Sequence, residues 1–372
     1  MPEPLTALAL LSLLAWLAVL AAPWQAWSSR ERLAAASEGR GDLSRVTVLI
    51  PARDEADVIE HTLRALARQG DALDVVLVDD GSEDATAELA ARAMPRARIV
   101  RAEPRPAGWS GKLWALDQGR HHLERPLTLL LDADIELRPG VVAAMPCKLE
   151  EEGRALVSLM ASLRQHSAWE RLLVPAFIYF FKMLYPFRLS NSAFPLVAAA
   201  AGGCILIRTS VIHELDLFTS IRGELIDDCA LARCVKSSGE RTWIGLSRDV
   251  VSHRPYDALG PIWDMVTRSA YTQLRHSVIL LGTCTLIMAL MFWVPLLALA
   301  DSQTFWIGLA TLAVTFTTYV PTLRYYDRNP AAAVLMPAVA TLYLAMTWHS
   351  AINHWRGTGA AWKGRAYGST GN

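Results

Sequence analysis

Acidic residues follow directly after two short apolar stretches of the sequence. Asp79 and Asp80 come after a valine-rich run, and Asp132 and Asp134 come after a run of leucines. Continuous apolar runs of this length are typical of parallel strands buried on both faces of a sheet. Ligands of such sheets bind beyond the carboxyl ends of the strands, so we expect these carboxylates to line one cleft.

The alternating pair Asp132 and Asp134 has the chemistry of a divalent-cation site. Two acids at the end of one strand point toward one cleft, and carboxylate oxygens suit Mg²⁺ or Mn²⁺. For any single acid the simpler alternative is a helix N-cap, and Ser82 or Asp84 could serve in this way.

A second acidic pair, Asp227 and Asp228, stands just before a predicted helix over 230–237. A positioned carboxylate can act as a general base. The structural alternative is that both acids favour the positive end of the helix dipole.

Alternating strands and helices must position these acids. The region from about 45 to 255 predicts βαβ units and a parallel sheet. The expected strands are 46–50, 74–78, 98–100 and 127–131, and the expected helices are about 55–69, 83–94 and 111–123.

Apolar segments flank this region on both sides. Four of them lack Asp, Glu, Lys and Arg and have the length of a membrane span: Leu5–Trp27, Ser277–Ala300, Thr304–Leu323 and Ala331–Ile352. A signal peptide is the alternative for the first, but no basic residue precedes it. Charge-free spans argue against a transporter.

Basic residues beside the spans predict their orientation. Arg30 and Arg32 follow the first span, which places its C-terminal end, and with it the 45–255 region, in the cytoplasm. The tail after the fourth apolar segment is also basic, so that segment is either re-entrant or an exception to the rule. The segment 168–187 is apolar but interrupted by charges and prolines. It predicts an amphipathic helix at the membrane surface, with a buried core helix as the alternative.

Composition excludes several classes of protein. Lys plus Arg and Asp plus Glu are both 36, so a strongly basic nucleic-acid-binding face is not expected. A hydrophobic fraction of 52% excludes a disordered chain. The five cysteines form no CxxC pair, which argues against a disulfide framework or a structural zinc site.

Four motifs in order, PARDE, LVDDGS, GKLWAL and LLDADIEL, resemble the family 2 glycosyltransferases. With the apolar flanks, the chain is similar to the ceramide-glucosyltransferase-like branch and most closely to the bacterial hopene-associated glycosyltransferases. The resemblance implies an α/β fold of the GT-A type, Rossmann-like and mostly parallel, as a cytoplasmic domain flanked by transmembrane α-helices.

The resemblance also implies roles for individual residues. Asp228 would be the catalytic base beside Asp227, which replaces the family's usual Glu, and Asp134 with Asp132 would bind Mg²⁺ or Mn²⁺. The residues implied in nucleotide-sugar binding are Pro51, Ala52, Arg53, Glu55, Asp79, Asp80, Lys112 and Asp132. A solvated residue at a helix start is the alternative for Lys112.

An acceptor or diphosphate region is implied by two further elements. The residues are Gly202, Gly203, Gln273, Arg275 and His276. In the second element His276 stands for the family's Trp and Gln273 is displaced by one position, which makes a processive polysaccharide synthase less expected. The alternatives are a simple glycine bend and an arginine that snorkels at the membrane boundary.

The expected protein is thus an inverting glycosyltransferase of the bacterial inner membrane. Its partners would be a UDP-sugar, a membrane lipid acceptor such as a hopanoid, and the bilayer, with no nucleic acid. A nucleotidyltransferase and a non-catalytic sugar-nucleotide binder are the alternatives. The expected organisation is an anchor over 1–28, a catalytic domain over 45–255, an amphipathic or gating segment over 256–276, a membrane region over 277–354 and a polar tail over 355–372.

Overall fold

The protein folds into two compact units. The computed structural model describes residues 3–36, 42–358, 361–362 and 365–366. The helical unit comprises Met1–Arg30, Gln165–Arg188 and Tyr256–Ala360, and the sheet unit comprises Glu31–Arg164, Leu189–Pro255 and Ala361–Asn372. The expected catalytic domain over 45–255 is therefore interrupted, because Gln165–Arg188 packs with the apolar helices.

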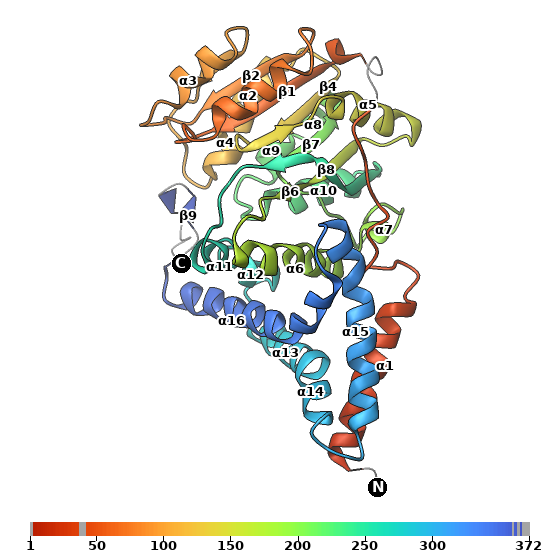
Figure 1. Ribbon diagram of the computed structural model, residues 1–372. Helices are drawn as coiled ribbons and strands as arrows, with labels where there is room; N and C mark the ends of the chain where they lie inside the picture. Colours follow the sequence, from red (N-terminus) through yellow and green to blue (C-terminus); the bar gives the residue numbers. More distant parts are fainter. Residues whose placement is uncertain (1–2, 37–41, 359–360, 363–364, 367–372) are drawn as a thin grey trace. The chain divides into compact units, whose positions relative to one another are not determined.

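An eight-stranded mixed sheet forms the centre of the sheet unit (Figure 1). The strands are β1 (Val46–Ala52), β2 (Asp74–Asp79), β3 (Arg98–Arg101), β4 (Leu127–Leu131), β5 (Ile135–Leu137), β6 (Leu156–Leu163), β7 (Cys204–Arg208) and β8 (Thr242–Ser252). Their order is β3-β2-β1-β4-β7-β6-β8-β5. Each of the four strands expected from the sequence is present.

The sheet is parallel on one side and mixed on the other. The pairs β2–β3, β1–β2 and β1–β4 are parallel, and so is β6–β8. The pairs β4–β7, β6–β7 and β5–β8 are antiparallel. Leu131 at the end of β4 pairs with Cys204 at the start of β7, so the glycines before Cys204 meet the acids after Leu131.

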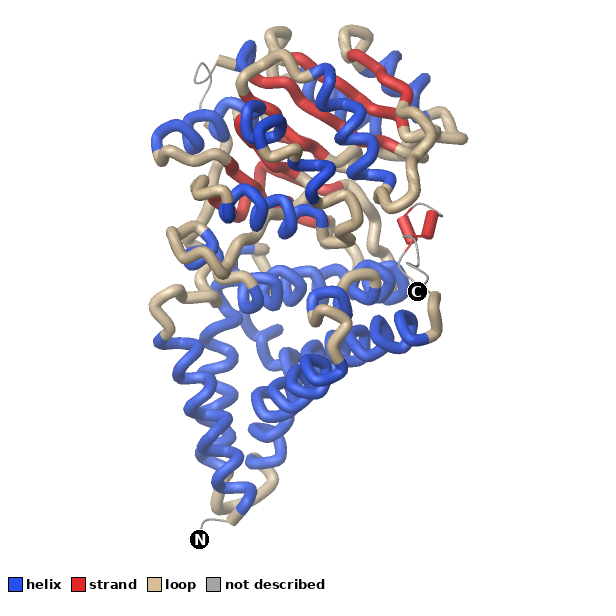
Figure 2. Tube along the Cα trace, turned by 180° about the vertical axis from the view of Figure 1, so that it is seen from behind, coloured by secondary structure: helices blue, strands red, loops and turns tan. Residues whose placement is uncertain are grey.

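Helices cover both faces of this sheet, as the view from behind in Figure 2 shows. They are α2 (Ile59–Ala67), α3 (Thr86–Ala93), α4 (Gly111–Gly119), α5 (Val141–Glu151), α8 (Thr209–Glu214), α9 (Leu217–Ser220) and α10 (Asp227–Ser237), with short 3₁₀ turns at Leu43–Arg45 and Arg120–His122. Alternation along β1 sends Val48 and Ile50 to the core beneath α2, α3 and α5, and Leu49 to the core beneath α4 and α10. Burial on both faces explains why the strand reads as a continuous apolar run.

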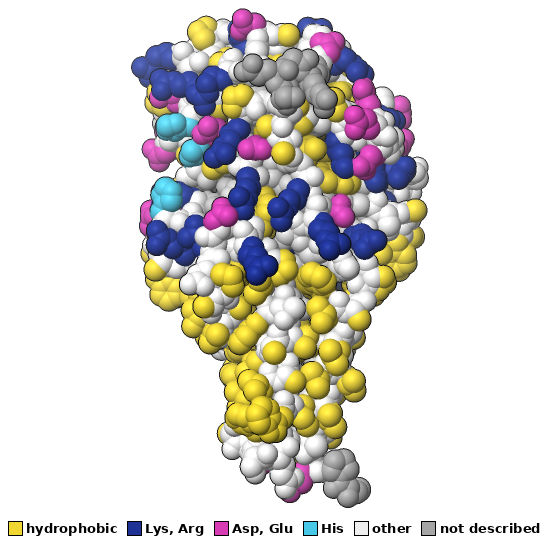
Figure 3. Space-filling model, turned by 45° about the vertical axis from the view of Figure 1, so that its right-hand side comes forward, with side chains coloured by type: hydrophobic (Ala, Val, Ile, Leu, Met, Phe, Trp, Pro, Cys, Tyr) yellow, Lys and Arg dark blue, Asp and Glu magenta, His cyan; other side chains and the backbone are white. Residues whose placement is uncertain are grey.

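Among the described residues, the helical unit contains four helices that are long and apolar enough to cross a membrane, namely Pro4–Ala21, Val278–Ala298, Phe305–Tyr325 and Pro330–Trp355. Its elements are α1 (Pro4–Ala21), α6 (Ala168–Leu184), α11 (Leu259–Thr267), α12 (Ala270–Gln273), α13 (Val278–Met288), α14 (Val294–Ala298), α15 (Phe305–Tyr325) and α16 (Met336–Trp355). A π-helical turn, Ala289–Trp293, joins α13 to α14, and a 3₁₀ turn, Pro330–Leu335, precedes α16. Figure 3 shows hydrophobic side chains covering one face of these helices.

The first apolar helix is shorter than the apolar run that predicts it. The run extends to Trp27, but α1 ends at Ala21. Pro23 lacks a backbone N–H and disfavours helical geometry in the residue before it, which ends the helix. The short α7 (Phe187–Ser190) lies where the chain passes from the helical unit to the sheet unit.

The helix α6 packs inside the helical unit. The hydroxyl groups of Tyr179 and Thr318 form a hydrogen bond with 2.8 Å between their oxygens. The Tyr343 hydroxyl donates a hydrogen bond to the Leu173 carbonyl at 2.9 Å. Lys182 is only 1% exposed and donates to the Ser28 carbonyl, to Ser29 and to Thr322. Within this unit α6 has the packing of the buried core helix, and a position at the membrane surface stays a prediction.

Candidate active site

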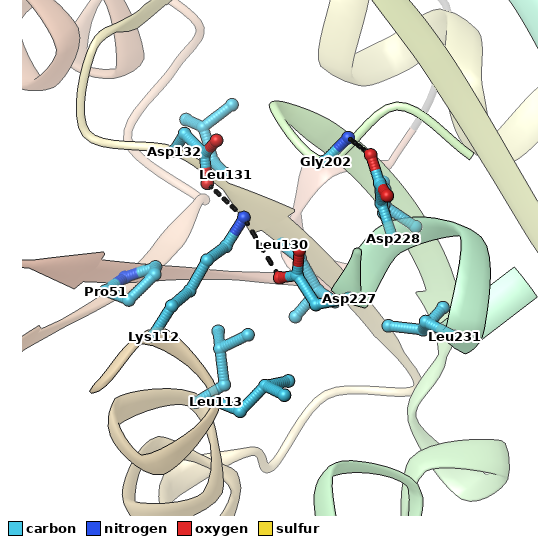
Figure 4. Close-up of a pocket in the computed structure, with 12 residues that line it drawn as sticks. Pro51, Lys112, Leu113, Leu130, Leu131, Asp132, Gly202, Asp227, Asp228 and Leu231 are labelled. Carbon is cyan, nitrogen blue, oxygen red and sulfur yellow. Dashed lines mark hydrogen bonds and ion pairs between the residues drawn. The ribbon is translucent and has the colours of Figure 1, made fainter. Parts of the chain in front are cut away.

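Lys112 lies between two acidic elements at the start of α4 (Figure 4). The Ser110 hydroxyl caps this helix by accepting the Leu113 N–H at 3.2 Å, which sets Lys112 in the first turn. Its Nζ lies 2.8 Å from Asp132 Oδ1 and 3.3 Å from Asp227 Oδ2. The lysine therefore links the end of β4 to the start of α10. Its side chain is mostly buried between these acids, so it is not the solvated helix-start residue of the alternative.

Burial and the neighbouring charges shift the pKa values of Lys112 and Asp132 in opposite directions. Burial disfavours the charged lysine, but Asp132 and Asp227 outweigh it and raise the pKa of Lys112 above its ordinary value. Burial also raises the pKa of Asp132, which Lys112 partly offsets. The lysine thus stays charged while surrounded by carboxylates.

Asp228 occupies the first turn of α10 and faces the same pocket. Its Oδ2 accepts the Gly202 N–H at 2.9 Å and its Oδ1 accepts the Cys229 N–H at 2.7 Å. Burial, together with the negative charge of Asp227, raises the pKa of Asp228 to about 6, although Lys112 and the two N–H donors act against the shift. A carboxylate with this pKa is ionised at neutral pH and can still accept a proton.

Gly202 leaves the space in which Lys112 and Asp228 face one another. A Cβ atom at this position would lie 3.2 Å from Lys112 Nζ and 3.4 Å from Asp228 Oδ2. The neighbouring Gly203 accepts the Asp132 N–H through its carbonyl at 3.1 Å, which fastens the glycine pair to the end of β4. Gly202 and Gly203 therefore contact the acidic residues Asp228 and Asp132 directly, which a simple bend in the chain would not require.

Residues after β1 and β2 form an adjoining part of the sheet edge. Arg53 Nη1 donates to the Asp80 carbonyl at 2.6 Å, and the buried Glu55 donates its N–H to Thr86 at 2.8 Å. Asp79 accepts both the N–H and the hydroxyl of Ser82, at 3.0 and 2.5 Å. Pro51 and Ala52 are the last two residues of β1, and Pro51 also lines the pocket shown in Figure 4.

Asp134 lies at the same edge but has different partners from Asp132. The Ser252 hydroxyl donates to Asp134 Oδ2 at 2.8 Å, and Arg254 Nε lies 3.4 Å from the same oxygen. Arg254 also reaches Glu55, with 3.1 Å between Nη2 and Oε1. Sequence reasoning missed Arg254, although a basic residue just after the end of β8 is the counter-charge that an acidic sheet edge requires.

The donor set at this edge fits a divalent cation shared with a diphosphate. Asp132 and Asp134 offer only carboxylate oxygens, and Mg²⁺ is usually held by one or two carboxylates together with substrate phosphates. Over the described part of the chain there is no group of three or more His, Cys, Asp or Glu side chains that could enclose a metal alone. Asp132 and Asp134 would supply two oxygen ligands to such an ion, and substrate phosphates would supply others.

Gln273, Arg275 and His276 belong to the helical unit. Gln273 accepts a hydrogen bond from the Tyr185 hydroxyl at 2.6 Å. Arg275 and His276 adopt positive φ angles of 51° and 54°, and the His276 ring stacks on His354 with 4.2 Å between centroids. The role of these residues toward the diphosphate stays a prediction.

Comparison with known proteins places the sheet unit in a class. Residues 47–216 match the family model described as Glycosyl transferase family 2. This segment of the chain is thus similar to that family, and the mixed sheet with its covering helices is a GT-A fold.

Individual relatives are consistent with this class. The chain is 26% identical over 129 residues to the 4,4'-diaponeurosporenoate glycosyltransferase of Staphylococcus haemolyticus, which is 34% of each chain. It is 31% identical over 130 residues to the undecaprenyl-phosphate 4-deoxy-4-formamido-L-arabinose transferase of Pseudomonas syringae, which is 34% of this chain and 38% of that one. The chain thus spans about a third of the length of the curated relatives it matches.

The fold also extends beyond the matched domain. A mannosyltransferase from Pyrobaculum calidifontis, solved with GDP-Man and Mn²⁺, superposes with a TM-score of 0.54 over 94% of this chain and 99% of that one, at 19% identity. At this identity the similarity concerns the fold alone.

Proposed function

We propose that the protein is a membrane-bound inverting glycosyltransferase that moves a sugar from a UDP-sugar to a hydroxyl of a membrane lipid. The observation that carries the proposal is a pocket lined by Lys112, Asp132 and Asp228. Lys112 and Asp132 belong to the segment that matches the family 2 glycosyltransferases, and Asp228 follows that segment in the sequence. Lys112 supplies a positive charge, Asp132 supplies one acid of the proposed metal-binding pair, and Asp228 supplies a carboxylate with a raised pKa. Sugar transfer from a diphosphate uses groups of these kinds.

Asp228 is proposed as the general base. The acceptor hydroxyl gives its proton to Asp228 as its oxygen forms a bond to the anomeric carbon, and the bond from that carbon to the donor phosphate oxygen breaks. The nucleoside diphosphate leaves with the electron pair of the broken bond. One base and one in-line displacement invert the anomeric centre without a covalent intermediate. The Gly202 N–H holds the carboxylate in place through Oδ2.

The donor is proposed to bind along the strand ends. Arg53, Asp79 and Asp80 are proposed to hold the base and ribose. The Arg53–Asp80 hydrogen bond, which joins the loops after β1 and β2, supports this by bringing these residues together. Lys112 places a permanent positive charge toward the diphosphate. A Mg²⁺ or Mn²⁺ ion held by Asp134 and Asp132 would offset the charge of the leaving diphosphate as a Lewis acid.

The acceptor is proposed to be a membrane lipid, with hopanoids as the class that the sequence resemblance favours. Four candidate spans in the same chain support a membrane location. Two relatives named for a diaponeurosporenoate and for an undecaprenyl phosphate support a lipid acceptor. The basic residues after the first span support a cytoplasmic catalytic domain in the bacterial inner membrane.

The test is product analysis with membranes that contain the protein. Membranes with and without the expressed chain would receive UDP-sugars and GDP-mannose in turn, and their lipids would be analysed by mass spectrometry. We expect a lipid whose mass rises by one sugar only with the expressed chain. If sugar transfer requires GDP-mannose, the UDP assignment is wrong. Release of pyrophosphate without a glycosylated lipid would instead support a nucleotidyltransferase.

A further inference from the structure

The loop 192–197 is the place where the sheet unit exposes large apolar side chains. Phe194 is 44% exposed and Leu196 is 83% exposed. Among the residues that the structure describes, the other exposed large hydrophobic side chains all belong to the helical unit. Phe194, Pro195 and Leu196 form the tip of this loop. Exposed apolar side chains are unfavourable in water, and a group of them marks a contact with a partner or a membrane.

Both stems of this loop are fastened to the sheet unit. Lys236 Nζ, in the last turn of α10, donates to the carbonyls of Ser190 and Val197, each at 2.7 Å. The Ser190 hydroxyl accepts the Ala199 N–H at 3.0 Å, which closes the base of the loop. Asn191 exchanges two hydrogen bonds with the backbone of Ile244. The apolar tip is therefore held out by a rigid base.

The loop leads directly into the candidate active site. Val197 is followed by four alanines and by Gly202, whose N–H binds Asp228. Lys236 and Asp228 lie on the same helix, eight residues apart (236 − 228), which corresponds to roughly 12 Å of rise. One helix thus holds the loop at its last turn and the proposed base at its first.

The covalent chain also ties the loop to the first candidate span. Arg188 Nη1 donates to the Pro23 carbonyl at 3.1 Å, two residues beyond the end of α1. Phe194 follows Arg188 by six residues (194 − 188), a length of chain that reaches at most roughly 20 Å. In the sequence, the loop therefore follows closely a residue that bonds just beyond the end of a candidate membrane span.

We infer that the loop 192–197 contacts the acyl chains of the bilayer, with Phe194 and Leu196 as the inserted side chains. The partner is a lipid surface, because the tip is apolar and follows by six residues (194 − 188) an arginine that bonds just beyond the end of a candidate span. Contact with the bilayer would bring the path of a lipid acceptor to the segment that carries Gly202. The bilayer contact stands independently of sugar transfer, whereas its use in acceptor delivery rests on the proposed function.

Spin labels at single cysteines test the contact without any activity assay. The full chain, with the partly exposed Cys147, Cys234 and Cys284 replaced by serine, would carry Leu196→Cys and be placed in liposomes of phosphatidylethanolamine and phosphatidylglycerol. Glu88→Cys on the exposed face of α3 is the aqueous control, and Ile279→Cys on α13 is the membrane control. Accessibility to oxygen and to a water-soluble nickel chelate would be measured for each label.

We expect the label at 196 to resemble the label at 279, accessible to oxygen and shielded from nickel by about tenfold relative to the label at 88. A label at 196 as accessible to nickel as the label at 88 would place the loop in water and overturn the inference. A label shielded from both reagents would mean that protein covers the loop, which also overturns it.

A second experiment addresses acceptor delivery. Phe194→Ser with Leu196→Ser should raise the KM for the lipid acceptor about tenfold and leave the KM for the sugar nucleotide unchanged, whereas Phe194→Leu should behave as wild type. An unchanged acceptor KM, in a protein whose transfer activity is established, would contradict the delivery role alone. Absence of transfer in the wild type would contradict the proposed function and leave the spin-label result standing.

Discussion

Two lysines of the sheet unit, Lys112 and Lys236, are both largely buried yet are expected to titrate in opposite directions. The carboxylates around Lys112 raise its pKa, whereas burial, with a smaller contribution from Arg154, lowers the pKa of Lys236 to about 8. Lys112 contacts Asp132 and Asp227, and Lys236 contacts two backbone carbonyls. The chemistry of the neighbours, more than burial, therefore distinguishes the lysine that we propose to bind a charged substrate from the lysine that holds a loop.

The largest expected effect concerns Asp228, the proposed base, which lines the same pocket as Lys112. Asp228→Asn keeps the shape of the side chain and removes its ability to accept a proton. We expect kcat to fall by about 10³-fold, within the usual range for general-base catalysis, with sugar-nucleotide binding retained. Transfer kinetics and a donor-binding titration on the same preparation would measure both. Near wild-type turnover would exclude Asp228 as the base.

The next effect concerns the metal-type acid pair. Asp134→Ala should lower transfer by about 10²-fold, as expected for the loss of electrostatic stabilisation of a leaving group, and should abolish stimulation by added Mn²⁺. Titration of Mn²⁺ against donor binding gives a readout that does not depend on turnover. Metal-stimulated donor binding that persists in the variant would contradict the assignment of Asp134.

Lys112→Met would test the charged lysine of the comparison. Its loss removes a positive charge from the diphosphate region, so we expect a fall in kcat/KM of about 30-fold, within the range of a lost charged hydrogen bond of ~2 kcal/mol. Because Lys112 also lowers the pKa of Asp228, the acidic limb of the pH–rate profile should move to higher pH. A limb that stays in place would show that the two groups are not coupled.

Lys236→Met would test the other lysine, and stability is the expected readout. Two carbonyls lose a donor, which costs about 1–3 kcal/mol, so the Tm of the full chain in detergent should fall by several degrees. The position of the pH–rate limb should not change, because Asp228 does not contact Lys236. A shifted limb with an unchanged Tm would reverse the roles that the comparison assigns to the two lysines.

The smallest expected effect is a shift in pH dependence. Asp228 must be ionised to accept a proton, so wild-type kcat/KM should rise with pH through about 6. Asp227→Asn removes a neighbouring negative charge that raises this pKa, so the limb should move to lower pH by less than about one unit. A limb that moves to higher pH would contradict the electrostatic account.

The sequence predicted those parts of the fold that short-range patterns determine. The expected strand 127–131 is the observed β4, and the helix expected over 230–237 is present as α10, which begins three residues earlier (230 − 227), at Asp227. Apolar runs buried on both faces of a sheet are readable in this way because no solvent-facing residue interrupts them.

Contacts between distant segments could not be predicted. The assignment of α6 to the helical unit depends on Lys182, which reads as an interruption of an apolar helix and binds Thr322 far along the chain. Arg254 was missed because its partners Glu55 and Asp134 lie more than a hundred residues away. Lys236 reads as an ordinary exposed residue at a helix end, and its role requires the loop carbonyls at Ser190 and Val197.

The central claim is sugar transfer to a lipid by the base Asp228, and product stoichiometry tests it most directly. Membranes that contain the wild type or Asp228→Asn would receive a sugar nucleotide labelled in the sugar, and labelled lipid and released nucleotide would be counted together. The account predicts one nucleoside diphosphate released for each labelled lipid in the wild type, and neither product in the variant. Released pyrophosphate, or labelled lipid formed equally by the variant, would contradict it.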